Sequence, residues 1–234
     1  MTDIENIFSE QGGVFCVPAK DFKKKLESIK AYIFDWDGVF NDGTKDHQGS
    51  SAFSEVDAMG TNLLRFSHYL HKNTLPLVAI MSGERNVLSF QLGTREHFNS
   101  IYYKVKNKVA AFEHFMAAHD LQPDEVAFVF DDVLDLGLAE QCGLRLLINR
   151  KGNPLFRNYV IKNNLTDYLT AQPGGQFAVR EVCELMMGTN GNFDTVIQHR
   201  SHFSTVYEQY LKERQQTETV SFTWDGTNIT RVKE

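Results

Sequence analysis

Short runs of apolar residues alternate along the chain with longer segments in which apolar residues recur every three or four positions. The runs end in polar side chains, a pattern typical of strands that are buried on both faces. They occupy residues 31–35, 76–82, 100–104, 125–132 and 144–149. Helical segments are predicted at residues 20–29, 57–72, 85–95 and 105–119. Because strands and helices alternate, the sequence predicts an α/β fold with a parallel sheet.

The segment between the first strand and its helix, residues 41–56, is too long for a plain turn. Its glycines, Gly43 and Gly49, favour a small β-hairpin. We therefore expect a β-hairpin flap beside the end of the first strand.

Both ends of the chain differ in character from this central part. Residues 1–19 contain glycine and proline breakers and are predicted to be irregular. After a break at residues 187–192, residues 194–213 predict a polar helix, and Asp225-Gly226 indicates a closing strand pair. We therefore expect an N-terminal extension, a central domain and a C-terminal extension, at residues 1–25, 26–190 and 191–234.

The composition limits the kinds of partner that the protein is expected to bind and the compartment in which it is expected to work. The chain has 24 basic and 30 acidic side chains, a net charge of −6, which argues against nucleic acid as its main partner. No apolar run approaches the ~20 residues of a membrane span, and the acidic N-terminus does not resemble a signal peptide. Three widely spaced cysteines fit reduced thiols. We expect a cytoplasmic protein that binds neither nucleic acid nor a membrane.

Candidate chemistry lies where the predicted strands end. Asp35, Ser82 and the pair Asp131-Asp132 follow three different strands. Ligands of open parallel sheets bind at the carboxyl ends of the strands, so these side chains should meet at one edge. Carboxylates that meet repel one another unless a cation holds them, and Mg²⁺ prefers such oxygen ligands and bridges to phosphate. The sequence therefore predicts a magnesium site.

The motif Asp35-Trp36-Asp37-Gly38 could carry out covalent catalysis. Asp35 could attack an electrophile, and Asp37 could serve as general acid and base. Taken alone, the motif is explained equally well as an ordinary turn after a strand, because aspartate and glycine dominate turns.

Two further groups of residues could bind phosphate. Ser82 and the amide at Gly83 could hold a phosphoryl oxygen, or merely form a turn. Lys108 could neutralise Asp35 and phosphate, although Lys104 and Lys106 offer the same chemistry.

The last acidic group, Asp131 and Asp132 with Asp135 beyond them, could also be an ordinary helix N-cap. Each of these signals is weak by itself. Their order along the chain is much more specific, because several independent coincidences are needed.

In this order the chain resembles the haloacid dehalogenase (HAD) superfamily of phosphotransferases. The four motifs are DWDG (35–38), MSG (81–83), Lys108 and DDVLD (131–135). The segment GGQFAVREVCELM (174–186) is similar to the capless branch that contains 3-deoxy-D-manno-octulosonate 8-phosphate phosphatase. The resemblance covers about residues 26–190.

The resemblance implies a Rossmann-like three-layer sandwich without a large cap domain. It also implies a Mg²⁺-dependent phosphatase that forms a phospho-aspartate on a small phosphorylated sugar or sugar acid. Members of the branch close the site with neighbouring subunits, so a homo-oligomer, typically a tetramer, is expected. An alternative is a binding or assembly subunit that kept the fold but has altered chemistry.

Residue roles follow from the same resemblance. Asp35 would be the nucleophile and Asp37 the general acid and base. The metal would be held by Asp35, by the backbone carbonyl of Asp37 and by Asp131. Phosphate would be bound by Ser82, Gly83 and Lys108. Asp132 and Asp135 would support this first set of ligands.

Three positions depart from the branch. Val56 and Glu84 stand where arginines are usual, and Phe130 stands where glycine is usual. Arginine is the natural partner of a carboxylate, so a sugar acid would lose two contacts and meet an acid. The sequence predicts poor activity on 3-deoxy-D-manno-octulosonate 8-phosphate.

Overall fold

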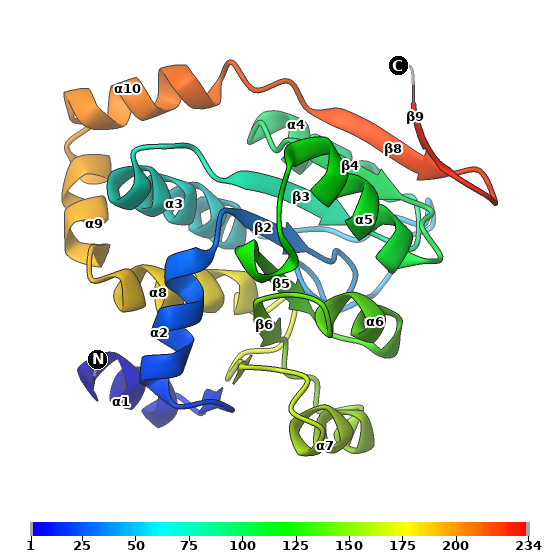
Figure 1. The fold of residues 1–234 in the computed structure, drawn as a ribbon, viewed down its shortest axis with the longest axis horizontal. Coiled ribbons are helices and arrows are strands. Elements are labelled where there is room, and N and C mark those ends of the chain that lie inside the picture. The colour runs from blue at the N-terminus through cyan, green and yellow to red at the C-terminus, as the bar shows by residue number, and fades with distance from the viewer. Residues whose placement is uncertain (1, 233–234) are drawn as a thin grey trace.

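The computed structural model describes residues 2–232, which form a nine-stranded sheet flanked by helices (Figure 1). The strand order is β1-β7-β6-β5-β2-β3-β4-β8-β9, and all neighbours are parallel except the outermost pairs, β1 with β7 and β8 with β9. The strands are β1 (Val14–Phe15), β2 (Ala31–Phe34), β3 (Leu77–Met81), β4 (Ser100–Tyr103), β5 (Val126–Phe130), β6 (Leu144–Leu147), β7 (Tyr168–Leu169), β8 (Val220–Trp224) and β9 (Ile229–Arg231).

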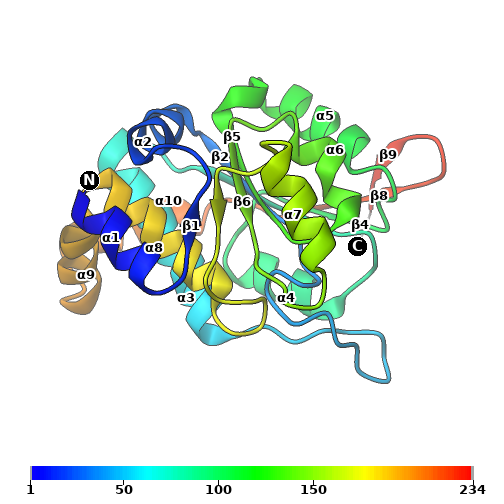
Figure 2. The same cartoon turned by 90° about the horizontal axis from the view of Figure 1, so that it is seen from below.

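Helices cover both faces, so the fold has the three layers that were expected (Figure 2). Side chains alternate along β2: Tyr32 and Phe34 enter one apolar core, and Ala31 and Ile33 enter the other. The first core is covered by α1 (Thr2–Glu10), α2 (Ala19–Ser28), α3 (Glu55–Lys72), α4 (Val87–Arg95), α8 (Ala178–Asn190), α9 (Phe193–Ser201) and α10 (Thr205–Arg214). The second is covered by α5 (Lys108–His119), α6 (Leu136–Ala139) and α7 (Pro154–Lys162).

The α/β prediction is confirmed, and each of the five predicted strands is present. The predicted helices correspond to α2, α3, α4 and α5, within a few residues at each end. Three of them begin at side-chain caps. The side chains of Ser54, Asn86 and Asn107 accept from the N–H groups of Val56, Leu88 and Val109, respectively. No helix within residues 2–232 is both long and apolar enough to span a membrane.

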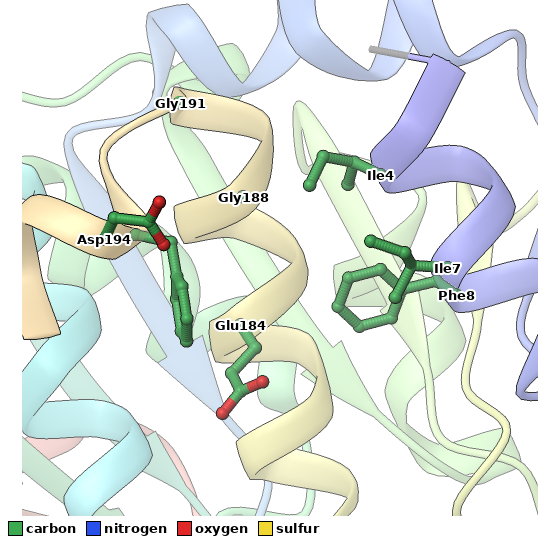
Figure 3. A pocket seen from close by; sticks show the side chains of 8 residues that line it. Ile4, Ile7, Phe8, Glu184, Gly188, Gly191 and Asp194 are labelled. Carbon is green, nitrogen blue, oxygen red and sulfur yellow. The ribbon is translucent and has the colours of Figure 1, made fainter.

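The prediction that residues 1–19 are irregular is wrong. They contain α1 and β1, and part of α2. Ile4 and Phe8, one helical turn apart, pack against the first core. Gly188 of α8 admits this contact, because a Cβ there would lie 2.9 Å from Ile4 Cδ1. Between α1 and α8 remains a cavity of about 360 Å³ (Figure 3).

The β-hairpin predicted in residues 41–56 is absent: residues 41–54 form a loop, and α3 begins at Glu55. Within residues 41–54 no strand is assigned, and the loop projects from the body of the protein (Figure 2). The chain still doubles back, because the Asp46 N–H donates to the Ser50 carbonyl at 2.8 Å. We call residues 41–54 the flap. No large cap domain interrupts the described chain.

The C-terminal helix prediction is also corrected. Residues 194–213 form two helices, α9 and α10, rather than one. The chain breaks at Phe203, whose φ is 47°, and the Ser204 hydroxyl then caps α10 by accepting from the Tyr207 N–H. The strand pair around Asp225-Gly226 is confirmed as β8 and β9. Both ends of the chain thus add strands to the central sheet, and the division into extensions and domain stays a prediction.

Candidate active site

Strand register brings the predicted site residues to one edge of the sheet. In β2, Phe34 lies opposite Ile80 of β3 and Val129 of β5. Because these three strands are parallel neighbours, Asp35, Ser82 and Asp131 leave them side by side. They line a cavity of about 230 Å³. The predicted convergence of these side chains is confirmed.

Three buried carboxylates form the centre of this cavity. One oxygen each from Asp35, Asp131 and Asp135 lies within 4.8 Å of the others. The Lys108 ammonium donates to Asp35 Oδ1 at 2.6 Å and also to Asp135 Oδ1. Arg150 Nη2 lies 2.5 Å from Asp131 Oδ2, without the alignment of a hydrogen bond. The carboxylates therefore outnumber the two cations that touch them.

Burial shifts the ionisation of these groups. Desolvation raises the pKa of Asp35 above its ordinary value, although the nearby Lys108 opposes the shift. The pKa of Asp131 is raised too, first by desolvation and then by the charge of Asp35. For Lys108, burial disfavours the ammonium, but Asp35 and Asp135 outweigh it and raise its pKa. The lysine is therefore charged at neutral pH.

The geometry fits a hard divalent cation. Asp131 is 2% exposed, yet neither of its carboxylate oxygens has a hydrogen-bond partner within residues 2–232. The Arg150 guanidinium is close to Oδ2 only, so Oδ1 has neither a hydrogen bond nor a cation beside it within the described residues. A buried carboxylate oxygen in that state is costly, and a bound cation would satisfy it. Asp35 and Asp131 provide the oxygen ligands that Mg²⁺ prefers.

We expect Asp131→Asn to weaken magnesium binding at least tenfold, because a charged ligand becomes neutral at a site with excess negative charge. Isothermal titration calorimetry with Mg²⁺ alone measures the change. Asp120→Asn, the same substitution at the exposed C-cap of α5, is the control and should bind as wild type does. Equal affinity of Asp131→Asn and wild type would contradict the assignment.

The structure distinguishes among the three candidate lysines. Lys108 is buried at the first position of α5, whereas Lys104 and Lys106 are exposed. Only Lys108 of these three contacts Asp35. Ser82 is buried and Gly83 lines the cavity, and the Ser82 hydroxyl accepts from the Glu84 N–H at 3.3 Å.

The sequence allows two interpretations of Asp132 and Asp135, as an ordinary helix cap or as part of the acidic site, and the structure contains both arrangements. Asp132 caps the short 3₁₀ turn Val133–Asp135, where its side chain accepts from the Val133 N–H at 2.7 Å. Asp135 accepts from the Asp132 N–H through one oxygen and from Lys108 through the other. Asp135 is therefore both part of a cap and part of the acidic cluster.

Asp37 lies apart from the cluster. Its carboxylate accepts from Lys45 Nζ at 2.6 Å and from Ser51 Oγ at 2.7 Å, and both partners belong to the flap. Asp37 still lines the cavity. Sequence reasoning missed Lys45, Ser51 and Arg150. Arg150 could have been found, because it follows β6 at the same edge of the sheet, whereas the flap contacts have no signal in the pattern.

Two glycines let the backbone close around the site. Gly38 has φ of +88°, and a Cβ there would lie 2.0 Å from Asp131 Oδ2. A Cβ at Gly174 would lie 2.0 Å from the Gly38 carbonyl oxygen. The Gly38 turn therefore lies directly against the Asp131 carboxylate, and the loop before α8 packs against the Gly38 turn.

The three positions that depart from the branch lie in different surroundings in the structure. Glu84 lines the cavity. Val56 is 42% exposed in the first turn of α3. Phe130 is buried and stacks on Phe128, with ring centroids 5.5 Å apart. Only Glu84 of these three lines the cavity.

Comparisons with known proteins agree with this fold and site. The 3-deoxy-D-manno-octulosonate 8-phosphate phosphatase KdsC of Yersinia pestis is 30% identical over 173 residues, which are 72% of this chain and 85% of that protein. The chain matches no family model. Fold and site define a HAD-type phosphatase, and the chain belongs to the KdsC family within that superfamily.

Solved structures show the same fold. A HAD superfamily (subfamily III A) hydrolase from Legionella pneumophila superposes with a TM-score of 0.63 at 26% identity, covering 81% of this chain and 95% of that one. The 3-deoxy-D-manno-octulosonate 8-phosphate phosphatase from Moraxella catarrhalis, solved with magnesium, phosphate and KDO, gives 0.64 at 24% identity, covering 79% and 99%. The predicted fold and family are confirmed.

Proposed function

We propose that the chain is a Mg²⁺-dependent phosphomonoester hydrolase that acts through a phospho-aspartate on a small phosphorylated sugar or sugar acid. The observation that carries the proposal is the pairing of buried Asp35 with Lys108, beside an Asp131 carboxylate without hydrogen-bond partners. The metal-bound and phosphate-bound structure of the Moraxella relative supports the choice of cofactor and substrate class.

The residues divide the chemistry between them. Lys108 fixes one oxygen of Asp35 and would neutralise charge on the transferring phosphoryl group. Ser82 and Gly83, which line the same cavity, would hold a phosphoryl oxygen. Asp35 would attack phosphorus while Asp37 protonates the leaving oxygen, and Asp37 would then take a proton from the water that hydrolyses the phospho-aspartate. When bound, Mg²⁺ would supply electrostatic stabilisation of the phosphoryl oxygens.

The proposal is tested by hydrolysis of p-nitrophenyl phosphate with Mg²⁺ and with EDTA. Turnover is expected only with the metal. Absence of turnover under both conditions would favour the alternative of a binding or assembly subunit. We further propose, from the sequence resemblance, that the chain works in the cytoplasm as a homo-oligomer, with a tetramer favoured.

Substrate choice should differ from that of the relatives named above. We expect kcat/KM on 3-deoxy-D-manno-octulosonate 8-phosphate to be at least tenfold below that on the best neutral sugar phosphate of a panel. The reason is that Glu84 faces the cavity, so a substrate carboxylate would meet a like charge there. Steady-state kinetics that ranked the sugar acid first would contradict this prediction.

Glu84→Gln provides the matched comparison, because it removes the charge and keeps the shape. We expect it to raise activity on the sugar acid and to leave activity on neutral sugar phosphates nearly unchanged.

A further inference from the structure

The tip of the flap is fixed by its own hydrogen bonds. The Asp46 side chain accepts from the Gln48 and Ser50 N–H groups at 2.8 and 2.9 Å. The Asp46 N–H and carbonyl bond to Ser50 and Gly49, and Gly49 adopts a φ of +76°, which favours glycine. The hydrogen bonds to Ser50 and Gln48 also hold the pKa of the Asp46 carboxyl below its ordinary value. The turn at residues 46–50 is therefore a defined structure.

This turn places Lys45 and Ser51 next to each other, one on each limb of the flap. Both side chains reach Asp37, one to each carboxylate oxygen: Lys45 to Oδ2 at 2.6 Å and Ser51 to Oδ1 at 2.7 Å. The exposed fraction of the side chain is 33% for Lys45 and 25% for Asp37, and Ser51 is buried. The side chain of Asp37, which lies in the turn after β2, is thus oriented by contacts with the flap.

The two contacts differ in what they allow chemically. A lysine ammonium has donors only, so the oxygen it binds, Oδ2, must remain an acceptor. A serine hydroxyl can either donate or accept, and that of Ser51 donates to Oδ1. Each oxygen of the Asp37 carboxylate therefore has its own partner on the flap, and the two contacts together restrict how the group can turn.

Lys45 also borders a second space. It lines a cavity of about 530 Å³ between the flap and residues 174–176, next to the cavity that Asp37 lines. The flap contact therefore lies at the junction between the phosphoryl site and the adjoining space.

We propose that Lys45 and Ser51 are positioning residues that hold the Asp37 side chain at the cavity, so that its action on the leaving group depends on the flap. The inference rests on the proposed phosphatase function and adds to it two residues outside the HAD motifs. Neither residue needs to touch the phosphoryl group.

The experiment uses two substrates that differ in their need for a proton. The leaving group of p-nitrophenyl phosphate departs readily without one, whereas that of an alkyl phosphate does not. Lys45→Met should lower kcat/KM on the alkyl phosphate about 10- to 100-fold, part of the 10²–10⁴-fold typical of a full general acid. The ratio kcat/KM is used because it covers only the steps up to departure of the leaving group and leaves out hydrolysis of the phospho-aspartate, which both substrates share. On p-nitrophenyl phosphate the loss should stay below about threefold, and Lys45→Arg should restore most of the alkyl activity.

A double variant tests whether Lys45 acts through Asp37. In an Asp37→Asn background, Lys45→Met should cause less than about a twofold further loss on the alkyl phosphate, because residues that act as one unit are not additive. Ser51→Ala should behave as Lys45→Met does. Gln48→Ala changes an exposed side chain at the flap tip that does not reach Asp37, and it should resemble wild type on both substrates.

The outcomes separate this inference from the function on which it rests. Selective loss on the alkyl phosphate, rescue by arginine and non-additivity with Asp37→Asn would support it. Equal losses on both substrates, no loss, or a full multiplicative loss in the Asp37→Asn background would overturn it while leaving the phosphatase function intact. Wild-type protein without Mg²⁺-dependent turnover of either substrate would overturn the proposed function itself.

Discussion

Asp35→Asn is expected to lower hydrolysis of p-nitrophenyl phosphate by about 10⁴-fold or more, the scale seen when a covalent nucleophile is removed. Asparagine is a far weaker nucleophile than a carboxylate, so no phospho-enzyme should form. The amide retains one oxygen that could still face the metal, so Mg²⁺ should bind, although more weakly. Rates on aryl and alkyl phosphates, with acid trapping of the phospho-enzyme, measure the effect.

Asp37→Asn is the matched control, because it makes the same change two residues along the chain. Its carboxylate lies outside the cluster of Asp35, Asp131 and Asp135. Asp35 could still attack in this variant, so the loss should be about 10²–10⁴-fold on the alkyl phosphate and smaller on the aryl phosphate. Phosphate trapped on Asp37, or full activity of Asp35→Asn, would reverse the two roles.

The central sheet could be predicted because its strands carry their own signals. The runs at β2, β3 and β5 are apolar throughout, and each is followed by a polar residue that lies at the shared edge of the sheet. The convergence of Asp35, Ser82 and Asp131 follows from this alone, since parallel neighbours end together. The residue pattern alone left Lys104, Lys106 and Lys108 as equal candidates, and only the family resemblance singled out Lys108. The structure buries Lys108 and leaves the other two exposed.

The missed parts depend on contacts between distant segments. α1 was overlooked because glycines follow it closely, although Ile4 and Phe8 have helical spacing. The flap forms no strands, because Asp46 satisfies the backbone of the turn through its side chain. The contact of Lys45 with Asp37 joins residues eight apart, and that of Ser51 joins residues fourteen apart, and no periodicity of the chain reports either.

Lys108→Met is expected to lower both activity and stability. Activity should fall about 10²–10³-fold, the usual cost of removing one group that stabilises transition-state charge. The metal-free protein should lose about 3–5 kcal/mol of unfolding free energy at pH 8, because two buried carboxylates lose their cation. Urea unfolding in EDTA measures this loss, and Lys106→Met, an exposed lysine two residues earlier, is the control.

The stability loss should depend on pH in a defined direction. Burial already raises the pKa of Asp35, and Lys108 opposes that shift, so removing the lysine raises the pKa further. A carboxyl whose pKa is higher in the folded than in the unfolded state stabilises the fold only while it is protonated, and it loses that contribution as pH rises through the folded value. The deficit of Lys108→Met relative to wild type should therefore be small at pH 5 and largest at pH 8. An equal deficit at both pH values would mean that Lys108 stabilises the site by packing rather than by its charge.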